Sequence, residues 1–240
     1  MLRRRGLTEM RTLGRWLLRL LLIAAAALIL VQGWYAVQIL WWRDHAPRET
    51  AFMAMREAEL KEHGRQPHVS YRWVPYDRIS PALKQAMIAA EDAKFVEHEG
   101  FDWDGIQQAM ERNYRRGRVV AGGSTITQQL AKNLFLSSQR SYWRKAEEAL
   151  ITLMLEALLD KRRIFELYLN VIEWGDGIFG CEAASRRYFG IAAAELDASQ
   201  AARLAAMAPN PRYYERHPEA RGLARKIPII MARMPAAELP

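Results

Sequence analysis

The sequence predicts a mainly α-helical domain behind one N-terminal transmembrane helix. Residues 20–42 are 23 consecutive uncharged positions, six arginines precede them, and helix-start signals recur along the rest of the chain while strand signals stay weak. With 240 residues, the chain can hold an anchor and one domain of ordinary size. A composition of 50% hydrophobic and 26% charged residues excludes a disordered chain.

The uncharged stretch at residues 20–42 fits a membrane-spanning helix. At about 1.5 Å per residue, a helix of this length crosses a hydrocarbon core of about 30 Å with some tilt. Trp34, Tyr35, Trp41 and Trp42 gather at its C-terminal end, where aromatic rings prefer the headgroup level. A cleaved signal peptide is disfavoured, because the apolar run is long and no small-x-small site follows it. We therefore expect an uncleaved anchor.

The positive charge of the chain is concentrated before this stretch. The first 19 residues carry six arginines against Glu9, a net charge of +5, which leaves +3 of the total +8 for the rest of the chain. This asymmetry is typical of membrane orientation and not of a nucleic-acid-binding face, and a buried core helix would not need it. We expect a cytoplasmic tail at 1–19, a span at 20–42, a juxtamembrane segment at 43–70 and an exported domain at 71–240. The one cysteine, Cys181, excludes an intramolecular disulfide.

Helix signals follow one another through the exported part. The expected helices cover residues 49–63, 81–91, 104–117, about 125–133, 142–160, 161–170, 182–189, 197–208 and 221–234. Their expected N-caps are Ser80, Asp104, Ser124 or Thr125, Ser141 and Asp197. Pro228 should kink or break the last helix. The best strand candidate is 69–74, and the glycines between 175 and 180 indicate a turn.

The first candidate site is the acidic stretch 91–100. Glu91 falls at the C-terminal end of an amphipathic helix, where a partly apolar setting raises the pKa of a carboxyl toward that of a general base. On spacing alone, a solvated acidic surface explains the stretch better. A metal site of His98 with Glu91 or Asp92 is weaker still, because no second histidine lies at ligand spacing.

The second candidate site is the segment 122–133. Two glycines lead into a helix N-terminus, where free backbone N–H groups favour an anion. Gln128 with Lys132, and Gln129 with Asn133, are four residues apart and form one polar face that carries a single cation. A flexible loop before a surface helix explains the glycines, but it explains the concentration of uncharged donors less well.

The third candidate site is the segment 140–148. Arg144 lies four residues and Lys145 three residues before Glu148, so all three can share a helix face. A surface ion pair is the commoner outcome of this spacing. The functional alternative is a carboxylate held among cations that also face a phosphate.

These three blocks, followed by 161–170, resemble family 51 peptidoglycan glycosyltransferases. The matching motifs are Glu-Asp-x-x-Phe-x-x-His-x-Gly at 91–100, Gly-Ser-Thr-Ile-Thr-Gln-Gln-Leu at 123–130, Arg-Lys-x-x-Glu at 144–148 and the segment 173–189. The resemblance covers about residues 70–215 and is strongest to the monofunctional biosynthetic type. Neither Ser-x-x-Lys nor Lys-Thr-Gly occurs, so we expect no penicillin-binding transpeptidase domain. The resemblance implies a lysozyme-like, mostly helical fold.

The resemblance also implies an activity, which is the polymerisation of lipid II onto a growing lipid-linked glycan chain at the periplasmic face of a bacterial inner membrane. Glu91 would be the general base for inverting attack by the acceptor 4-hydroxyl, and Glu148 would orient the cations around the donor pyrophosphate. The implied substrate-binding residues, among which Asp92, Phe95 and His98 would support Glu91, are Asp92, Phe95, His98, Ser124, Thr125, Gln128, Gln129, Lys132, Asn133, Arg140, Arg144 and Lys145.

The implied partners are the lipid-linked substrates and the membrane, together with other cell-wall synthesis or division proteins, and not nucleic acid. No dedicated metal ligand cluster is visible, so we expect no required cofactor. A divalent cation, Mg²⁺ or Mn²⁺, could still assist the pyrophosphate.

Two rival functions fit parts of the sequence. A lytic transglycosylase or lysozyme-like hydrolase shares the fold type and a catalytic glutamate, but a glycosidase needs a second carboxylic acid to protonate its leaving group. Glu148, with Arg140, Arg144 and Lys145 around it, would stay ionised. The second rival is a non-enzymatic membrane scaffold of the cell-wall machinery. Degradation of glycan strands by the purified protein would favour the first rival, and inactivity toward lipid II the second.

Overall fold

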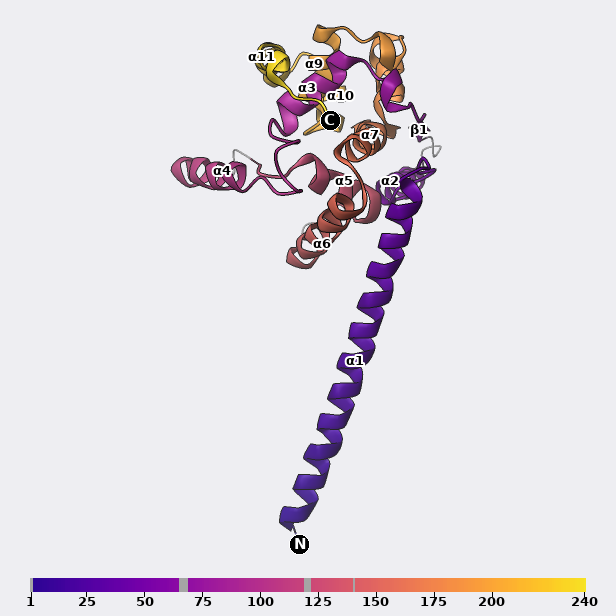
Figure 1. Ribbon diagram of the computed structural model, residues 1–240, viewed down its shortest axis with the longest axis vertical. Helices are drawn as coiled ribbons and strands as arrows, with labels where there is room; N and C mark the ends of the chain where they lie inside the picture. The colour runs from indigo at the N-terminus through magenta and orange to yellow at the C-terminus, as the bar shows by residue number, and fades with distance from the viewer. Residues whose placement is uncertain (1, 65–68, 119–121, 140) are drawn as a thin grey trace.

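The computed structural model describes residues 2–64, 69–118, 122–139 and 141–240, with side chains from residue 14 onward. One long helix, α1 (Leu2–Trp42), carries a helical domain at its C-terminal end (Figure 1). The predicted mainly α class is confirmed. The remaining helices are α2 (Ala51–Glu62), α3 (Pro81–Glu91), α4 (Trp103–Arg116), α5 (Ile126–Phe135), α6 (Tyr142–Leu158), α7 (Lys161–Val171), α8 (Cys181–Phe189), α9 (Ala198–Met207), α10 (Pro211–Arg216) and α11 (Arg221–Arg233).

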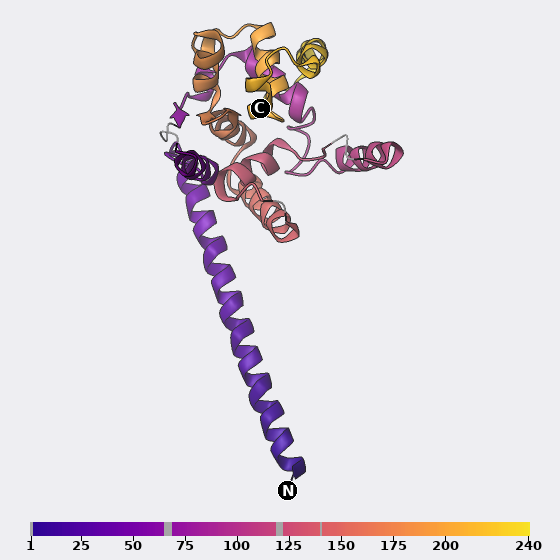
Figure 2. The ribbon, with the colours of Figure 1, turned by 180° about the vertical axis from the view of Figure 1, so that it is seen from behind.

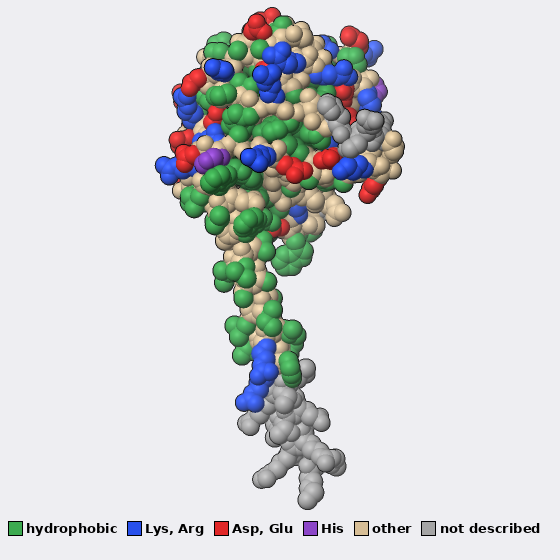
Figure 3. All heavy atoms as spheres, turned by 90° about the vertical axis from the view of Figure 1, so that its right-hand side faces the viewer, with side chains coloured by type: hydrophobic (Ala, Val, Ile, Leu, Met, Phe, Trp, Pro, Cys, Tyr) green, Lys and Arg blue, Asp and Glu red, His purple; other side chains and the backbone are tan. Residues whose placement is uncertain are grey.

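Helix α1 has the length and composition of a membrane span. Its apolar part runs over Gly14–Trp42, 29 residues, and the most apolar 18-residue stretch within it has a mean hydropathy of 2.2 and 0% burial inside the protein. Figure 3 shows this part as a rod without acidic side chains below a domain that carries acidic and basic groups over its surface. The helix is thus compatible with a single-pass anchor, and the predicted span at 20–42 lies within it.

The C-terminal end of α1 packs into the domain. Ile39 and Trp42 are buried in the core, and the ring of Tyr35 lies 4.7 Å from that of Phe135 on α5. Arg163 of α7 donates from Nε to the carbonyl of Trp42 at 2.7 Å, which satisfies a carbonyl at the end of the helix. Of the four aromatic residues predicted at the headgroup level, two therefore face the domain, while Trp34 and Trp41 remain exposed.

Helix α2 belongs to the same core. Thr50 caps it, and Phe52 and Met53 are buried against the domain. Arg56 forms a two-pronged ion pair with Glu173, with Nε and Nη2 at 2.6 and 2.8 Å from the two carboxylate oxygens. The predicted juxtamembrane segment 43–70 therefore supplies part of the core that we expected to begin at residue 71.

Most predicted helix starts are confirmed by the caps. Ser80, Thr125, Ser141 and Asp197 each accept a hydrogen bond from the first turn of the following helix. The Asp104 cap is wrong, because Asp102 caps α4 by accepting from the amide of Gly105 at 2.9 Å. Both aspartates precede the same amphipathic run, so local sequence alone did not distinguish them. Helix α4 ends at Gly117 as expected, with φ of 60°.

The sheet and the C-terminal region differ more from the prediction. A short sheet has the order β1-β3-β2, with β1 (Ser70–Tyr71) parallel to β3 (Ile178–Phe179) and β2 (Glu173–Gly175) antiparallel to β3. Only β1 was foreseen, and α10 was missed. Pro228 does not end α11, whose buried Leu223 and Ile230 hold it to the domain on both sides of the proline.

Two sets of helices build the core. Helix α3 packs against α9 and α11, while α5 packs against α6 and α7. Helix α4 projects sideways from this body, as Figures 1 and 2 show from opposite sides. The end of α3 and the polar face of α5 lie where the two sets meet, since the side chains of Glu91 and Gln129 are in contact there.

Candidate active site

Glu91 is the last residue of α3, and its carboxylate is partly buried between helices. Its Oε2 accepts a hydrogen bond of 2.8 Å from the side-chain amide of Gln129 on α5. Burial raises the pKa of Glu91, and the nearby negative charge of Asp92 adds to this. The amide of Gln129 and the positive charges of Lys226 and Lys132 act in the opposite direction. Glu91 thus has the surroundings of a carboxyl that can exchange a proton.

The residues after Glu91 hold the loop in place. Asp92 is buried, accepts from Nε2 of His98 at 3.0 Å, and accepts from the backbone amide of Ile126 at 3.0 Å. It therefore ties the end of α3 to the start of α5. Phe95 is fully buried and packs on Phe165 with ring centroids 5.5 Å apart. Phe95 cannot contact a substrate directly in this structure, and its burial agrees with the supporting role that was inferred for it.

The polar residues of α5 divide into internal and accessible ones. The hydroxyl of Thr125 donates to the carbonyl of Gly100, and Gln128 completes the capping box with Thr125, so both side chains are buried and bonded within the fold. Asn133 is also buried and donates back to the carbonyl of Gln129. These bonds tie the three side chains to backbone groups, and their contact with substrate stays a prediction. Ser124 is exposed.

Glu148 lies on α6 with two cations around it. Nη1 of Arg144 is 2.6 Å from one carboxylate oxygen, and Nζ of Lys145 contacts the other. The Glu148 side chain is 4% exposed, whereas that of Lys145 is 48% exposed, so the ion pairs run from the interior to the surface. Arg140, which was predicted to join this cluster, lies outside the described residues.

Lys132 is influenced electrostatically by both carboxylates. It is half-buried on α5, and its charge interacts with Glu148, Arg144, Lys145 and Glu91. Burial lowers the pKa of Lys132, the carboxylates oppose this, and the two neighbouring cations add to it. The structure thus brings Glu91 and the Glu148 cluster within electrostatic range of one lysine, although they lie on different helices.

Comparison with known proteins agrees with this arrangement. The family described as Transglycosylase matches residues 57–235, which is most of the chain. The chain belongs to the transglycosylase family. It is similar to the "Biosynthetic peptidoglycan transglycosylase" of Dechloromonas aromatica, with 61% identity over 96% of this chain and 100% of that protein. Proteins of the same name from Chromobacterium violaceum and Methylobacillus flagellatus are 58% and 60% identical, over 95% and 92% of this chain and 100% and 96% of theirs.

Membership of the transglycosylase family confirms three of the sequence predictions. The chain is a glycosyltransferase-type enzyme, its domain has the lysozyme-like helical class, and the resemblance drawn from residues 91–100, 123–130 and 144–148 was correct. The roles of individual residues remain predictions, supported by the geometry above.

Sequence reasoning missed two residues near Glu91. Tyr168 of α7 donates its hydroxyl to Oε1 of Gln129 at 3.1 Å, and Lys226 of α11 lines a hollow of about 190 Å³ together with Glu91 and Arg233. Neither lies in a polar motif: Tyr168 sits in a largely apolar run, and Lys226 sits in the basic last helix. Only the packing of α7 and α11 on the site reveals them.

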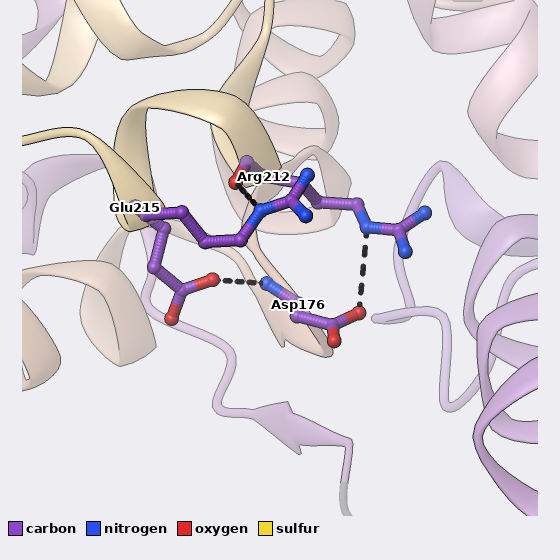
Figure 4. Close-up of a pocket in the computed structure, with 4 residues that line it drawn as sticks. Asp176, Arg212 and Glu215 are labelled. Carbon is purple, nitrogen blue, oxygen red and sulfur yellow. Dashed lines mark hydrogen bonds and ion pairs between the residues drawn. The ribbon is translucent and has the colours of Figure 1, made fainter. Parts of the chain in front are cut away.

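A second hollow lies away from these carboxylates. Figure 4 shows Asp176, Arg212 and Glu215 lining it, where the β2–β3 turn meets α10. Glu215 accepts from the backbone amide of Asp176 at 2.7 Å, and Arg212 lies 3.5 Å from the Asp176 carboxylate. These acidic and basic groups pair with one another. The residues that line the hollow therefore link the β2–β3 turn to α10.

Across the part of the chain that the structure describes, no group of three or more His, Cys, Asp or Glu side chains could hold a metal ion. The nearest candidate from the sequence, His98 with Asp92, is an internal pair that also serves the α5 N-terminus. These residues do not fit a resident metal centre. A cation that arrives bound to a phosphate-bearing substrate needs fewer protein ligands, so such binding does not require a preformed cluster.

Proposed function

We propose that this transglycosylase polymerises lipid II into β-1,4-linked peptidoglycan strands, with inversion at the donor anomeric carbon and release of polyprenyl pyrophosphate. The observation that carries the proposal is that a partly buried Glu91 and the Glu148 ion-pair cluster both lie within electrostatic range of Lys132. Polymerisation by inversion needs a base at the attacking hydroxyl and positive charge at the leaving group. Glu91 offers the base, and the cations around Glu148 offer the positive charge.

Glu91 acts as the general base in this proposal. The acceptor 4-hydroxyl gives its proton to Glu91 as its oxygen attacks the anomeric carbon of the donor chain. Burial raises the pKa of Glu91, which strengthens it as a base, while the Gln129 amide keeps the ionised form accessible. The carboxylate thus accepts a proton at the moment when the new glycosidic bond forms.

The cations neutralise the leaving group. When the bond between the anomeric carbon and the pyrophosphate oxygen breaks, the electron pair stays on the pyrophosphate. Lys132, Arg144 and Lys145 supply positive charge for it, and Glu148 keeps the last two in place through direct ion pairs. Pyrophosphate then leaves without a proton, so no second carboxylic acid is needed, in contrast to a glycosidase.

A divalent cation can add to this neutralisation. Mg²⁺ is commonly held by substrate phosphates with only one or two protein carboxylates, so its use would not require a preformed protein site. The steps assigned to Glu91 and the three cations do not depend on it.

We place the enzyme in the bacterial inner membrane with residues 1–19 in the cytoplasm and the domain in the periplasm. The arginine-rich tail and the apolar Gly14–Trp42 segment support this orientation. A reporter enzyme that works only in the periplasm should be active when fused after Pro240. Activity of a reporter that works only in the cytoplasm would contradict the orientation.

The central experiment is polymerisation of labelled lipid II by the purified full-length protein in detergent. We expect long glycan strands that lysozyme digests. Release of fragments from preformed strands, with no polymer from lipid II, would instead indicate a lytic enzyme. Absence of both activities would favour the scaffold alternative.

Because Ser-x-x-Lys and Lys-Thr-Gly are missing from the sequence, labelled penicillin should form no covalent adduct with this chain.

A further inference from the structure

A chain of two side-chain hydrogen bonds ends on Glu91. Tyr168, fully buried on α7, donates its hydroxyl to Oε1 of Gln129 at 3.1 Å. Gln129 in turn donates from Nε2 to Oε2 of Glu91 at 2.8 Å. The three side chains come from α7, α5 and the end of α3, so the chain crosses the junction between the two sets of core helices. Tyr168 itself does not reach the carboxylate.

The two ends of the Gln129 amide are chemically different. Nε2 carries two protons and can only donate, while Oε1 can only accept. An ionised carboxylate can only accept, so it needs Nε2 and not Oε1 as its neighbour. If the amide rotated by half a turn, Oε1 would face Glu91, which could then form the contact only in its protonated state. The orientation of this amide therefore biases the protonation of Glu91.

Tyr168 decides the orientation of the amide. Burial raises the pKa of Tyr168 well above its usual value, so the hydroxyl keeps its proton. A buried hydroxyl proton needs a hydrogen-bond acceptor. Among the described residues, Oε1 of Gln129 is the acceptor for that proton. A rotated amide would offer Nε2 to the tyrosine and leave the buried hydroxyl proton without an acceptor, which is unfavourable.

We propose that Tyr168 is a positioning residue for the base, holding the Gln129 amide so that it donates to the ionised Glu91. The inference rests on the proposed function in one respect, which is that Glu91 must be ionised to accept the proton of the acceptor hydroxyl. The hydroxyl group, and not the ring, carries this role. The ring fills the core beside Phe165, where a phenylalanine would pack equally well.

Removing the hydroxyl should change how Glu91 titrates. Lys226 on α11 and Lys132 on α5 favour the ionised carboxylate, while Asp92 and burial oppose it. None of these changes in Tyr168→Phe. The amide, however, becomes free to turn its oxygen toward Glu91, which favours the protonated form and raises the pKa of Glu91 further. Because the base must be ionised, the acid limb of the pH–rate profile moves to higher pH.

The test is the pH dependence of lipid II polymerisation by the full-length Tyr168→Phe protein. We expect the acid limb to move alkaline by about half to one pH unit, the effect of one ordinary net hydrogen bond, because the freed amide can still turn its donor toward the ionised carboxylate. At a pH on that limb the rate falls about 3- to 10-fold, and on the alkaline plateau it returns close to that of the unaltered protein. If the acid limb of Tyr168→Phe lies at the same pH as that of the unaltered protein, the proposal is overturned.

Two further variants separate positioning from packing. Tyr188→Phe removes another tyrosine hydroxyl bond, to the carbonyl of Trp174 at 2.7 Å, and should leave the limb in place even if it lowers thermal stability. Gln129→Leu removes the amide, so adding Tyr168→Phe to it should produce no further shift. A second shift of equal size in the double variant would mean that Tyr168 acts on Glu91 by another route.

A readout without substrate keeps this inference distinct from the proposed activity. A carboxyl with a raised pKa costs stability when ionised, so Glu91→Gln should stabilise the protein at neutral pH. That gain should be larger in the Tyr168→Phe background, because the Gln129 donor to Glu91 is no longer held in place there. If the unaltered protein proves inactive on lipid II, the proposed function fails, while an equal gain in both backgrounds is what would reject the role of Tyr168.

Discussion

Glu91 and Glu148 are both poorly exposed glutamates that interact with Lys132, but their immediate neighbours differ in kind. Glu91 has a neutral amide in contact, and burial is the largest influence on its pKa. Glu148 has two cations in direct contact, both supplied by the preceding turn of its own helix. The first environment suits a group that gains and loses a proton, and the second suits a group that remains an anion.

This contrast separates a transferase from a hydrolase more clearly than the fold does. A lysozyme-like enzyme that cleaves strands needs one of its carboxyls protonated to assist a poor leaving group. In this chain the second carboxyl is occupied by Arg144 and Lys145, so it is suited to organising positive charge for a phosphate. The cations one helical turn from Glu148 thus help to distinguish a transferase from a hydrolase that has the same fold.

The largest expected effect is that of Glu91→Gln. Glutamine keeps the volume but cannot accept the proton, so polymerisation should fall by about 100- to 10,000-fold. Initial rates on labelled lipid II measure this. Glu97→Gln, the same change at an exposed position on the same loop, should leave the rate unchanged. Near-full activity of Glu91→Gln would show that the base lies elsewhere.

The cations come next. If these residues hold the donor pyrophosphate as proposed, Lys132→Ala or Arg144→Ala each removes a charge-assisted contact worth about 1.5–3 kcal/mol, so the rate should fall at least about tenfold. Lys61→Ala is the matched control, because Lys61 is exposed on α2 and pairs with Glu57 at the surface. If both site variants behave like Lys61→Ala in steady-state kinetics, these residues do not bind the pyrophosphate.

Substitution by glutamine should reduce activity less at Glu148 than at Glu91. In Glu148→Gln the amide oxygen can still accept from Arg144, so measurable activity should remain, while Glu148→Ala should retain less. The alanine variant leaves two cations without their partner, which should cost up to about 3 kcal/mol of unfolding free energy. Activity and thermal unfolding, measured together, test this. A dead Glu148→Gln beside an active Glu91→Gln would reverse the two assignments.

The smallest effect is on stability. Because burial raises the pKa of Glu91 in the folded protein, the unfolded chain loses the proton first as pH rises, and the ionised group then costs stability. Glu91→Gln should therefore raise the Tm at pH 7.5, and the gain should vanish below about pH 4, where the glutamate is protonated in both states. Equal Tm values for Glu91→Gln and the unaltered protein at pH 7.5 would show that burial of Glu91 carries no such cost.

Local sequence was sufficient for the features that depend on neighbours within a few positions. The Ser80, Ser141 and Asp197 caps, the end of α4 at Gly117, and the pairing of Arg144 with Glu148 all involve residues at most four positions apart. The motif order singled out Glu91 and Glu148 as the two carboxylates of interest, and their roles stay predictions. Where two local solutions existed, as with Asp102 and Asp104, the wrong one was chosen.

Contacts between distant segments could not be foreseen in the same way. The β2–β3 hairpin, the burial of Phe52 in the domain core and the packing of Trp42 on Phe135 depend on how the helices meet. Their partners carry no local signal, since an apolar residue on one helix can match many others. For this reason the boundary expected at residue 71 divides a core that is continuous in space.

The sequence alone established a helical enzyme domain on an apolar anchor and named its two carboxylates, because caps, charge asymmetry and motifs are properties of adjacent residues. Tertiary structure decided which groups surround each carboxylate. Gln129 contacts Glu91 across 38 positions and Tyr168 contacts Gln129 across 39, while Lys226 approaches from the last helix. The protonation of Glu91 depends on burial and on these distant donors and charges, and both arise only when α3, α5, α7 and α11 pack together.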